Sequence, residues 1–294
     1  MAIRKDDPGI SSVLKKPLWL RKWHREPEFM TILERYLKPN EIFFDLGCNI
    51  GYVSLYILQN ITNEGFLYAI DPDPKNISAL KTSIKENDIN KKYTIENIAL
   101  SSKDGEIGFE FSEESNLHKI NNKLPLDSPT YRKINCRSFD SYFSNKSLPT
   151  FIKMDVEGAE IDILNGMESF LESSSKCKIL MELHPTLYSS KECIDSFELL
   201  FKNGFKLEKF IGSAFAHSHP LLKDNYIPSE KFKSGGFTRA IYNNVTKDDF
   251  YKILLNKIPH KSLYNSSTYI RRPKTLFKPF LKSTKLARAA FFVR

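Results

Sequence analysis

Short apolar runs alternate with helically spaced apolar residues along most of the chain. Runs bounded by turn residues predict buried strands, namely 41–46, 65–71, 92–100, 150–155, 177–183 and 205–211. Apolar residues at helical spacing predict helices, namely 28–37, 53–61, 74–87, 159–173 and 193–204. Strands that alternate with helices are typical of βαβ units, so we expect an α/β domain built on a mostly parallel sheet.

Two polar stretches interrupt this alternation. Residues 106–138 predict a hairpin and loop that end in a strand at 133–139. A second polar stretch, about 212–236, precedes a late strand at 237–243. Because long polar stretches are uncommon inside compact domains, we expect the second one to be a lid or flap.

The composition is that of an ordinary globular protein, with 41% hydrophobic and 27% charged residues among 294. The longest apolar runs are far shorter than the roughly 18 residues that a membrane span needs. The first residues also lack the apolar segment of a secretory signal. The four cysteines have no CxxC spacing, which favours free thiols in a reducing compartment. We therefore expect a cytoplasmic protein.

The net charge of +9 is confined to the end of the chain. The last acidic residue is Asp249, and the 11 Lys and Arg after it leave 33 − 35 = −2 for the preceding residues. We expect a basic N-terminal arm at 1–27, a domain at 28–249 and a basic C-terminal tail at 250–294. The tail interleaves basic and aromatic residues, which leaves three roles open: packing on the domain, peripheral docking on a membrane, or contact with nucleic acid.

Candidate ligand-binding residues lie where the predicted strands end, because ligands bind there in open parallel sheets. After the first strand, Gly47 and Gly51 permit a tight turn into a helix whose N-terminus attracts anions. The turn is not GxGxxG, and Asp45 before it would repel a pyrophosphate. S-adenosylmethionine carries an ammonium and a sulfonium, so Asp45 suits that cofactor better. A plain strand-to-helix turn is the alternative.

The next two strands supply further candidates for an adenosine site. Asp71 ends the second strand, 20 residues after Gly51, where a carboxylate can accept ribose hydroxyls. Asp73 is a candidate helix N-cap. Near the end of the third strand, Asn97 and Ala99 lie where we expect the edge of an adenine.

Three carboxylates follow the fourth strand, at Asp155, Glu157 and Glu160. Such a group is costly unless a cation, a proton or hydrogen-bond donors compensate it. Glu157 and Glu160 suit a helix N-terminus, whereas Asp155 lies at the strand tip, where we expect it to face the reacting methyl group. Glu182 and His184 end the adjacent strand.

Four stretches of this sequence together resemble the FkbM family of S-adenosylmethionine-dependent methyltransferases, namely 45–51 (DLGCNIG), 69–74 (AIDPDP), 138–143 (SFDSYF) and 152–166 (IKMDVEGAEIDILNG). The resemblance covers roughly residues 41–210. It implies a Rossmann-like class I methyltransferase fold with a seven-stranded sheet, helices on both faces, and O-methylation, often of sugar hydroxyls. It implies cofactor contacts at Asp45, Gly47, Asn49, Gly51 and Asp71. It also implies a catalytic or structural role for the carboxylates at Asp155, Glu157 and Glu160.

The acceptor side of such a site would be formed by Asp155, Glu182 and His184. Their adjacent strand ends could hold a divalent ion through Asp155 and Glu182, or could place His184 as a base. A hydrogen-bonded structural histidine is the alternative for His184. His217 and His219 could reach an acceptor from the polar stretch, although loop histidines are usually solvated.

Three functions remain open. We expect an O-methyltransferase acting on a hydroxyl of a saccharide, a glycolipid or another small acceptor. An RNA 2′-O-methyltransferase is the alternative suggested by the basic tail and by Lys153 beside Asp155, and a non-catalytic adenosyl-ligand-binding protein is the third. No Asp/Asn-Pro-Pro-aromatic motif follows the fourth strand, which disfavours N-methylation of bases.

Overall fold

The computed structural model describes residues 26–111, 119–120, 128, 130–174, 176–185, 188, 190–214, 219–234, 237–255 and 287–294. The predicted arm lies outside these residues up to position 25, and so do residues 256–286 of the predicted tail and His217.

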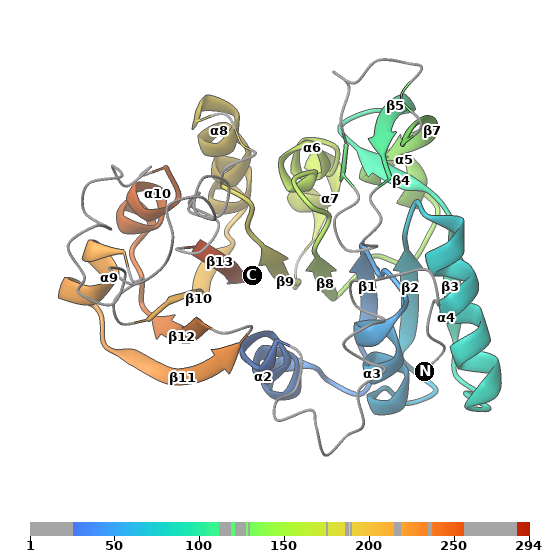
Figure 1. Cartoon of the computed structure of the whole chain (residues 1–294), viewed down its shortest axis with the longest axis horizontal. Coiled ribbons are helices and arrows are strands. Elements are labelled where there is room, and N and C mark those ends of the chain that lie inside the picture. The colour runs from blue at the N-terminus through green and yellow to red at the C-terminus, as the bar shows by residue number, and fades with distance from the viewer. Residues whose placement is uncertain are drawn as a thin grey trace, which may run out of the picture.

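The main sheet has nine strands in the order β11-β12-β10-β13-β9-β8-β1-β2-β3 (Figure 1). Five neighbouring strands are parallel, namely β1 (Ile42–Leu46), β2 (Phe66–Ile70), β3 (Tyr93–Glu96), β8 (Phe151–Met154) and β9 (Lys178–Glu182). The other four pair antiparallel with their neighbours, namely β10 (Lys206–Ser213), β11 (Pro228–Ser234), β12 (Phe237–Asn243) and β13 (Ala287–Val293). The sheet is therefore mixed and only partly parallel.

The expectation of seven strands was wrong, because β11 and β13 join the sheet in addition to the predicted strands. β13 comes from the segment assigned to the basic tail and lies between β9 and β10. Its residues Ala289, Ala290, Phe291 and Phe292 are fully buried. The end of the chain is thus part of the domain core, because an apolar run in an otherwise basic segment is stabilised by burial against two strands.

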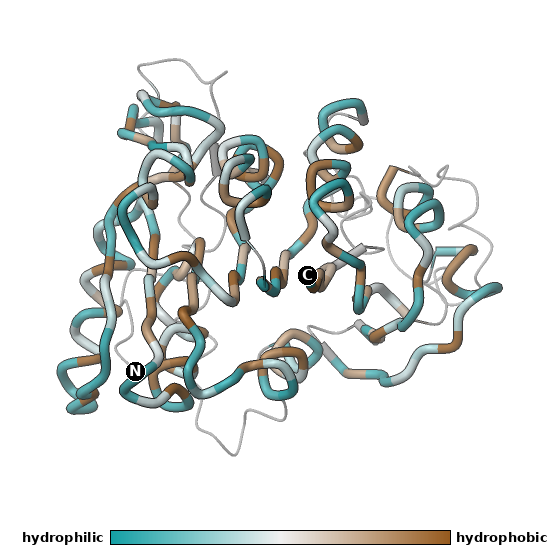
Figure 2. Tube along the Cα trace, turned by 180° about the vertical axis from the view of Figure 1, so that it is seen from behind, coloured by the Kyte–Doolittle hydropathy of each residue, from teal (hydrophilic) through white to brown (hydrophobic). Residues whose placement is uncertain are grey.

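Helices cover both faces of the sheet, as expected (Figure 1). One face packs on α2 (Pro27–Tyr36), α3 (Tyr52–Asn60) and α4 (Pro74–Glu86). The other packs on α5 (Phe139–Phe143), α6 (Glu160–Asn165), α7 (Glu168–Ser173), α8 (Ser190–Lys202) and α10 (Lys247–Leu255). Successive strand residues such as Phe43 and Phe44 enter opposite cores, as the alternation of a buried strand requires. Figure 2 shows hydrophobic and hydrophilic positions alternating along these elements.

The single helix predicted at 159–173 is divided into α6 and α7 around Gly166. A Cβ atom at Gly166 would lie 2.3 Å from the carbonyl oxygen of Ser101. The Gly166 carbonyl in turn accepts a hydrogen bond from the Asp140 amide at 2.9 Å. Close packing against two other segments, which the helical spacing does not report, therefore bends the chain here.

A second, smaller sheet lies beyond the carboxyl ends of β1 and β2 (Figure 1). Its strands are ordered β4-β7-β5-β6, with β4 at Ala99–Ser101, β5 at Gly105–Glu110, β6 at Lys119–Ile120 and β7 at Tyr131–Ser138. The antiparallel pair β5 and β7 confirms the predicted hairpin. The strand predicted at 92–100 is divided, because its last residues leave the main sheet and form β4.

The described part of the polar stretch at 212–236 contains regular structure, and its role as a flap stays a prediction. After the end of β10 it forms α9 (Pro220–Asn225) and the edge strand β11. Arg35 on α2 binds the carboxylate of Glu230 on β11 through both guanidinium nitrogens, one of them at 2.7 Å. Pairing to β12 and to α2 therefore gives regular structure to a segment whose composition predicts a loop.

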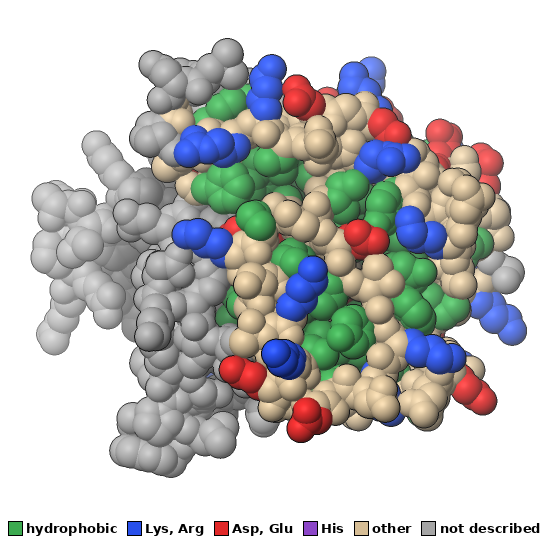
Figure 3. Space-filling view, turned by 90° about the vertical axis from the view of Figure 1, so that its right-hand side faces the viewer, with side chains coloured by type: hydrophobic (Ala, Val, Ile, Leu, Met, Phe, Trp, Pro, Cys, Tyr) green, Lys and Arg blue, Asp and Glu red, His purple; other side chains and the backbone are tan. Residues whose placement is uncertain are grey.

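The side of the molecule that carries α4 and β3 is shown in Figure 3. Basic and acidic side chains are scattered over this face rather than gathered by sign. Tyr93 on β3 is 38% exposed. Within the described part of the chain, no helix combines the length and the apolar character needed to cross a membrane.

Candidate active site

The glycine turn after β1 packs directly against the end of β8. Gly47 has φ of 74° and Gly51 has φ of 90°, a left-handed conformation that glycine adopts without strain. A Cβ atom at Gly47 would lie 1.9 Å from the carbonyl oxygen of Asp155. The Gly47 amide donates to the Ile70 carbonyl at 2.9 Å, and the Asp155 amide donates to the Leu46 carbonyl at 3.1 Å. The turn is thus fixed between the ends of β2 and β8.

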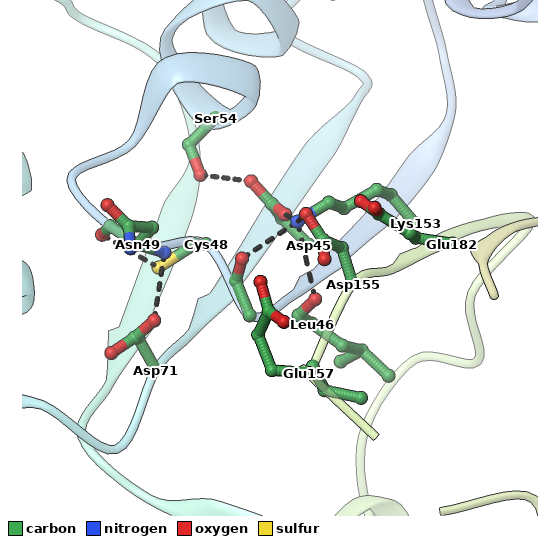
Figure 4. A network of polar contacts seen from close by, with 12 residues as sticks. Asp45, Leu46, Cys48, Asn49, Ser54, Asp71, Lys153, Asp155, Glu157 and Glu182 are labelled. Atoms are coloured by element: carbon green, nitrogen blue, oxygen red, sulfur yellow. Dashed lines mark hydrogen bonds and ion pairs between the residues drawn. The ribbon is translucent and has the colours of Figure 1, made fainter. Parts of the chain in front are cut away.

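Asp45 is fully buried, and both of its carboxylate oxygens contact other side chains (Figure 4). Lys153 Nζ lies 3.1 Å from Oδ1, and the hydroxyl of Ser54 on α3 donates to Oδ2 at 2.6 Å. The cationic partner expected for Asp45 is therefore supplied by the chain itself. The pairing of Asp45 with Lys153 could not be predicted from the sequence, because the two residues meet only through the register of β1 and β8.

Lys153 connects the glycine turn after β1 to the acidic cluster formed by Asp155, Glu157 and Glu160. Its side chain is 5% exposed, and its ammonium donates to the Gly47 carbonyl at 2.7 Å and lies 3.8 Å from Asp155 Oδ2. Burial alone would lower the pKa of Lys153, but the charges of Asp45 and Asp155 raise it above its usual value. Lys153 is therefore a permanent cation between two carboxylates.

Asp71 at the end of β2 is buried and holds the turn from the other side (Figure 4). Its Oδ2 accepts from the Asn49 amide at 2.9 Å, and its Oδ1 accepts from the Asp73 amide at 2.9 Å and from Asn76 Nδ2 at 3.1 Å. Burial raises the pKa of Asp71 to about 6, although these hydrogen bonds oppose the shift. Asp73 caps α4 by accepting from the Lys75 amide, which confirms the N-cap reading.

The two residues expected near an adenine occupy different places. The side chain of Asn97 donates to the Asp71 carbonyl at 3.0 Å, so it lies at the end of β2 beside the glycine turn. Ala99 is buried in β4 and pairs with Cys136 on β7. Ala99 therefore belongs to the second sheet, because the chain turns away from β3 after Asn97.

His184 lies among three carboxylates after β9. Its Nδ1 is 2.8 Å from Glu160 Oε1, and its Nε2 is 3.3 Å from Glu157 Oε2 and 3.9 Å from Glu182 Oε1. Burial alone would lower the pKa of His184, but Glu160 and Glu157 raise it well above 6.5. Of the two alternatives, the contacts of both ring nitrogens with carboxylates favour the hydrogen-bonded structural histidine, and the role of His184 as a base stays a prediction.

Further hydrogen bonds hold this histidine in place. The Tyr188 hydroxyl donates to Glu160 Oε2 at 2.9 Å and accepts from the His184 amide at 2.8 Å. Tyr188 was not a candidate in the sequence, because no motif places it near Glu160. The buried group formed by Glu160, His184 and Tyr188 is thus bonded on several sides.

Asp155 and Glu157 are the more open carboxylates of the cluster, with side chains 24% and 29% exposed. Glu157 has φ of 50°, a strained conformation for a residue with a side chain. Burial raises the pKa of Glu157, and His184 opposes the shift. Asp155, Glu157 and His184 offer atoms within 4.8 Å of one another, a spacing that a metal ion could use. Glu182 is not part of that group, and metal binding stays a prediction.

A model of the methyltransferase FkbM domain matches residues 45–207, which is more than half of the chain. The protein belongs to the FkbM methyltransferase family. The match begins at Asp45 and includes the glycine turn, the acidic cluster and β9, so the site described above lies inside the family domain.

This FkbM methyltransferase is similar to the hexuronic acid methyltransferase AglP of Haloferax volcanii, with 27% identity over 174 residues. The match covers 57% of this chain and 66% of AglP, slightly less than two thirds of that protein. Among solved structures, it is similar to a putative rRNA-methylase from Clostridium thermocellum, with 7% identity, a TM-score of 0.42, and coverage of 76% of this chain and 98% of that chain. A further match is a SAM-dependent O-methyltransferase from Thermotoga maritima, with 9% identity, a TM-score of 0.41, and coverage of 78% and 70%.

The fold of this FkbM methyltransferase brings the sequence candidates into two adjoining groups. Gly47, Asn49, Gly51, Asp71 and Asn97 surround the turn after β1, and Asp155, Glu157, Glu182 and His184 lie at the ends of β8 and β9. Lys153 lies between the groups. A lysine inside the apolar run 151–154, where a buried strand is predicted, is the signal that could have revealed it.

Proposed function

We propose that this FkbM methyltransferase transfers a methyl group from S-adenosylmethionine to a hydroxyl of a saccharide. The observation that carries the proposal is the direct packing of the Gly47 turn on the backbone of Asp155. This packing brings the turn that would hold a nucleoside cofactor next to a group of partly open carboxylates. In this proposal, the two line the same site. The hexuronic acid acceptor of the related AglP supports a saccharide.

The residues after β1 and β2 fit S-adenosylmethionine. Gly47 lets the turn approach the Asp155 backbone more closely than any side chain would allow, because a Cβ atom there would lie 1.9 Å from the Asp155 carbonyl oxygen. Asp71 uses three of about four acceptor positions for bonds within the chain, which leaves capacity for a ribose hydroxyl. When bound, the cofactor supplies an electrophilic methyl group on a positively charged sulfur.

Each residue then has a role in binding. The turn Gly47–Gly51 presents its backbone and the N-terminus of α3 to the amino-acid part of the cofactor. Asp71 accepts from the ribose, and Asn97 supports it from the adenine side. Asp45 contributes through Lys153 and Ser54, since both carboxylate oxygens contact these residues.

On the acceptor side, Asp155 binds the hydroxyl and accepts its proton at a carboxylate oxygen as the new oxygen–carbon bond forms. A carboxylate suits this role because positioning contributes most of the catalysis of methyl transfer, and a modest base is sufficient. His184 stays protonated and holds Glu157 and Glu160, while Glu182 packs against its Nε2 side. Glu157 is the second open carboxylate and lines the acceptor side.

Isotope tracing tests the proposal. Methyl-labelled S-adenosylmethionine is incubated with the protein and an extract of the source cells, and the product is treated with ribonuclease, protease and glycosidase. We expect label that survives ribonuclease and protease and is released with saccharide. We also expect Asp155→Asn to reduce the label about 100-fold. Glu168→Gln, a change at an exposed carboxylate on α7, serves as the matched control and should leave the label unchanged.

Other outcomes of this experiment would contradict the proposal. Label released by ribonuclease would identify an RNA 2′-O-methyltransferase instead. Binding of S-adenosylmethionine without transfer to any fraction would favour a protein that binds the cofactor but does not catalyse the transfer.

A further inference from the structure

Lys153 makes close approaches to oxygen atoms from three segments of the site (Figure 4). Its Nζ lies 3.1 Å from Asp45 Oδ1, 2.7 Å from the Gly47 carbonyl oxygen, 3.5 Å from the Leu46 carbonyl oxygen and 3.8 Å from Asp155 Oδ2. An ammonium carries three N–H donors, so it can donate to the Gly47 and Leu46 carbonyls while its charge attracts the Asp45 and Asp155 carboxylates. Lys153 thus contacts the end of β1, the glycine turn that follows it and the end of β8.

The ammonium has two physical effects on these segments. It compensates the charge of Asp45, which is fully buried and would otherwise be very costly. The same ammonium, which donates to the Gly47 carbonyl, also attracts the Asp155 carboxylate. Lys153 Nζ lies 3.8 Å from Asp155 Oδ2, so this attraction draws the 24% exposed carboxylate toward the turn. Lys153 therefore contributes to the position of Asp155 relative to the turn.

A second lysine, Lys178, has a side chain 13% exposed and pairs with a buried carboxylate at the other end of the same sheet. Lys178 at the start of β9 contacts the Glu41 carboxylate and donates to the Tyr36 carbonyl at 2.7 Å. Its contacts lie at the amino end of the strands, away from the glycine turn. Lys178 therefore offers a matched control of the same residue type, similar burial and the same kind of partner.

We propose that Lys153 is a positioning residue that holds the Asp155 carboxylate against the glycine turn after β1. Its charge also sets the electrostatic potential of the space between Asp155 and this turn. The inference rests on the proposed function, because it takes Asp155 as the group that meets the acceptor hydroxyl. Lys153 itself touches neither acceptor nor proton and acts through Asp155. It accounts for a buried lysine inside an otherwise apolar strand.

The first test needs no acceptor. Calorimetry measures the Kd values of S-adenosylmethionine and S-adenosylhomocysteine, which differ by the methyl group and the positive charge on sulfur. We expect Lys153→Met to raise the preference for S-adenosylmethionine about fivefold, because a positive charge leaves the site. Asp155→Asn should lower that preference, and Lys178→Met should leave it unchanged. If Lys153→Met weakens both ligands equally, Lys153 is only structural and the inference fails.

The second test measures turnover at saturating S-adenosylmethionine, with the saccharide fraction that accepts label as the acceptor. We expect Lys153→Met to lower the rate about 100-fold, the loss typical of a misplaced reacting group, and Lys153→Arg to recover part of it. In an Asp155→Asn background, Lys153→Met should cause no additional loss, because both changes remove the same effect. If the double variant loses turnover by the product of the two separate losses, the inference is contradicted.

Folding is checked by urea unfolding of each variant. If Lys153→Met does not fold, the double variant Lys153→Met/Asp45→Asn replaces it, since removing the buried pair as a unit leaves no lone charge. The turnover comparison with Asp155→Asn is then made in that double variant, with the same expected and contradicting results. If no fraction accepts label from the unmodified protein, the proposed function fails, whereas the ratio of the two Kd values still decides the role of Lys153.

Discussion

The two ends of the parallel strands solve the same electrostatic problem in different surroundings. At the amino end, Lys178 contacts Glu41, and Glu41 also accepts from the hydroxyl of Thr150. At the carboxyl end, Lys153 pairs with Asp45 and reaches into the site. Both ends therefore contain a buried lysine and carboxylate, but only the second pair lies beside further carboxylates and a glycine turn.

Backbone conformation separates the two ends more sharply. Gly47, Asn49, Gly51, Glu157 and Gly158, all after β1 or β8, have positive φ. The described residues just before β1, β2, β8 and β9 include none with positive φ. Strained backbone persists where surrounding structure enforces it, and it gathers at functional sites. The contrast teaches that a buried ion pair alone does not mark a site, whereas the same pair combined with left-handed residues does.

The largest expected effect comes from Gly47→Ala. The new Cβ would overlap the Asp155 carbonyl oxygen, and φ of 74° is unfavourable for alanine. We expect a loss of about 4 kcal/mol in the free energy of unfolding and no measurable binding of S-adenosylmethionine by the folded fraction. Urea unfolding and calorimetry measure the two effects.

A matched glycine lies at the amino end. A Cβ atom at Gly65 would lie 2.9 Å from the Pro39 carbonyl oxygen, without a positive φ. Gly65→Ala should lower stability less and leave the Kd of S-adenosylmethionine unchanged. Equal loss of binding in both variants would show that the two ends do not differ as we infer.

The next effect is the loss of stability in Lys178→Met. The change leaves the buried Glu41 carboxylate without its cation, which costs about 3 kcal/mol in the free energy of unfolding. The Kd of S-adenosylmethionine should stay within about twofold of the original value, because the change lies at the opposite end of the strands. Urea unfolding and calorimetry test the prediction, and a large loss of cofactor affinity would contradict it.

A smaller effect concerns the pH dependence of stability through His184. Because its pKa is raised in the folded protein, His184 contributes stability that is complete below about pH 6.5, the pKa in the unfolded chain. This contribution is lost as pH rises toward the folded pKa, with a slope of up to about 1.4 kcal/mol per pH unit. Urea unfolding at several pH values should show the slope, and His184→Gln should remove it. The same slope in the variant would assign it to another group.

The smallest effect is the pH dependence of cofactor binding. Asp71 accepts ribose hydroxyls best when ionised, and its pKa is raised to about 6. We expect the Kd of S-adenosylmethionine to be constant above pH 7 and to rise as pH falls below 6, approaching about tenfold per pH unit. Asp71→Asn should bind more weakly and with a flatter profile. A profile unchanged by that substitution would remove Asp71 from the cofactor site.

The raised pKa of Asp71 also affects stability, with a sign that can be checked separately. An acid whose pKa is higher in the folded chain stabilises that chain below about pH 4, where it is protonated in both states. This contribution is lost as pH rises to about 6. Asp71→Asn should therefore flatten the stability profile between these values.

Six strands of the main sheet could be predicted from apolar runs, because each run is long enough to report its own burial. β13 could not, since Ala289–Phe292 look like a short apolar interval in a basic segment and gain their stability from β9 and β10. The division of the predicted helix at Gly166 was also hidden, because the close approach of Ser101 involves a residue far away in the sequence. Local patterns miss features that depend on a distant partner.

The site shows the same division. The glycine turn, Asp71 and the acidic group after β8 could be picked out as candidates, since ligands bind at the carboxyl ends of the strands in open parallel sheets. The pairing of Asp45 with Lys153 depends on which residues of β1 and β8 lie in register. The protonation of His184 depends on Glu157 and Glu160 lying within hydrogen-bonding reach.

The sequence by itself determined the alternating α/β architecture, the family and the strand ends that carry the chemistry, because periodicity and short motifs are local properties. Only the tertiary structure decided that the end of the chain enters the sheet, that Asp45 pairs with Lys153, and that His184 lies within hydrogen-bonding reach of Glu157 and Glu160. Charge and protonation depend on the distance to other charges and on exclusion of water. Both are set when remote segments pack together.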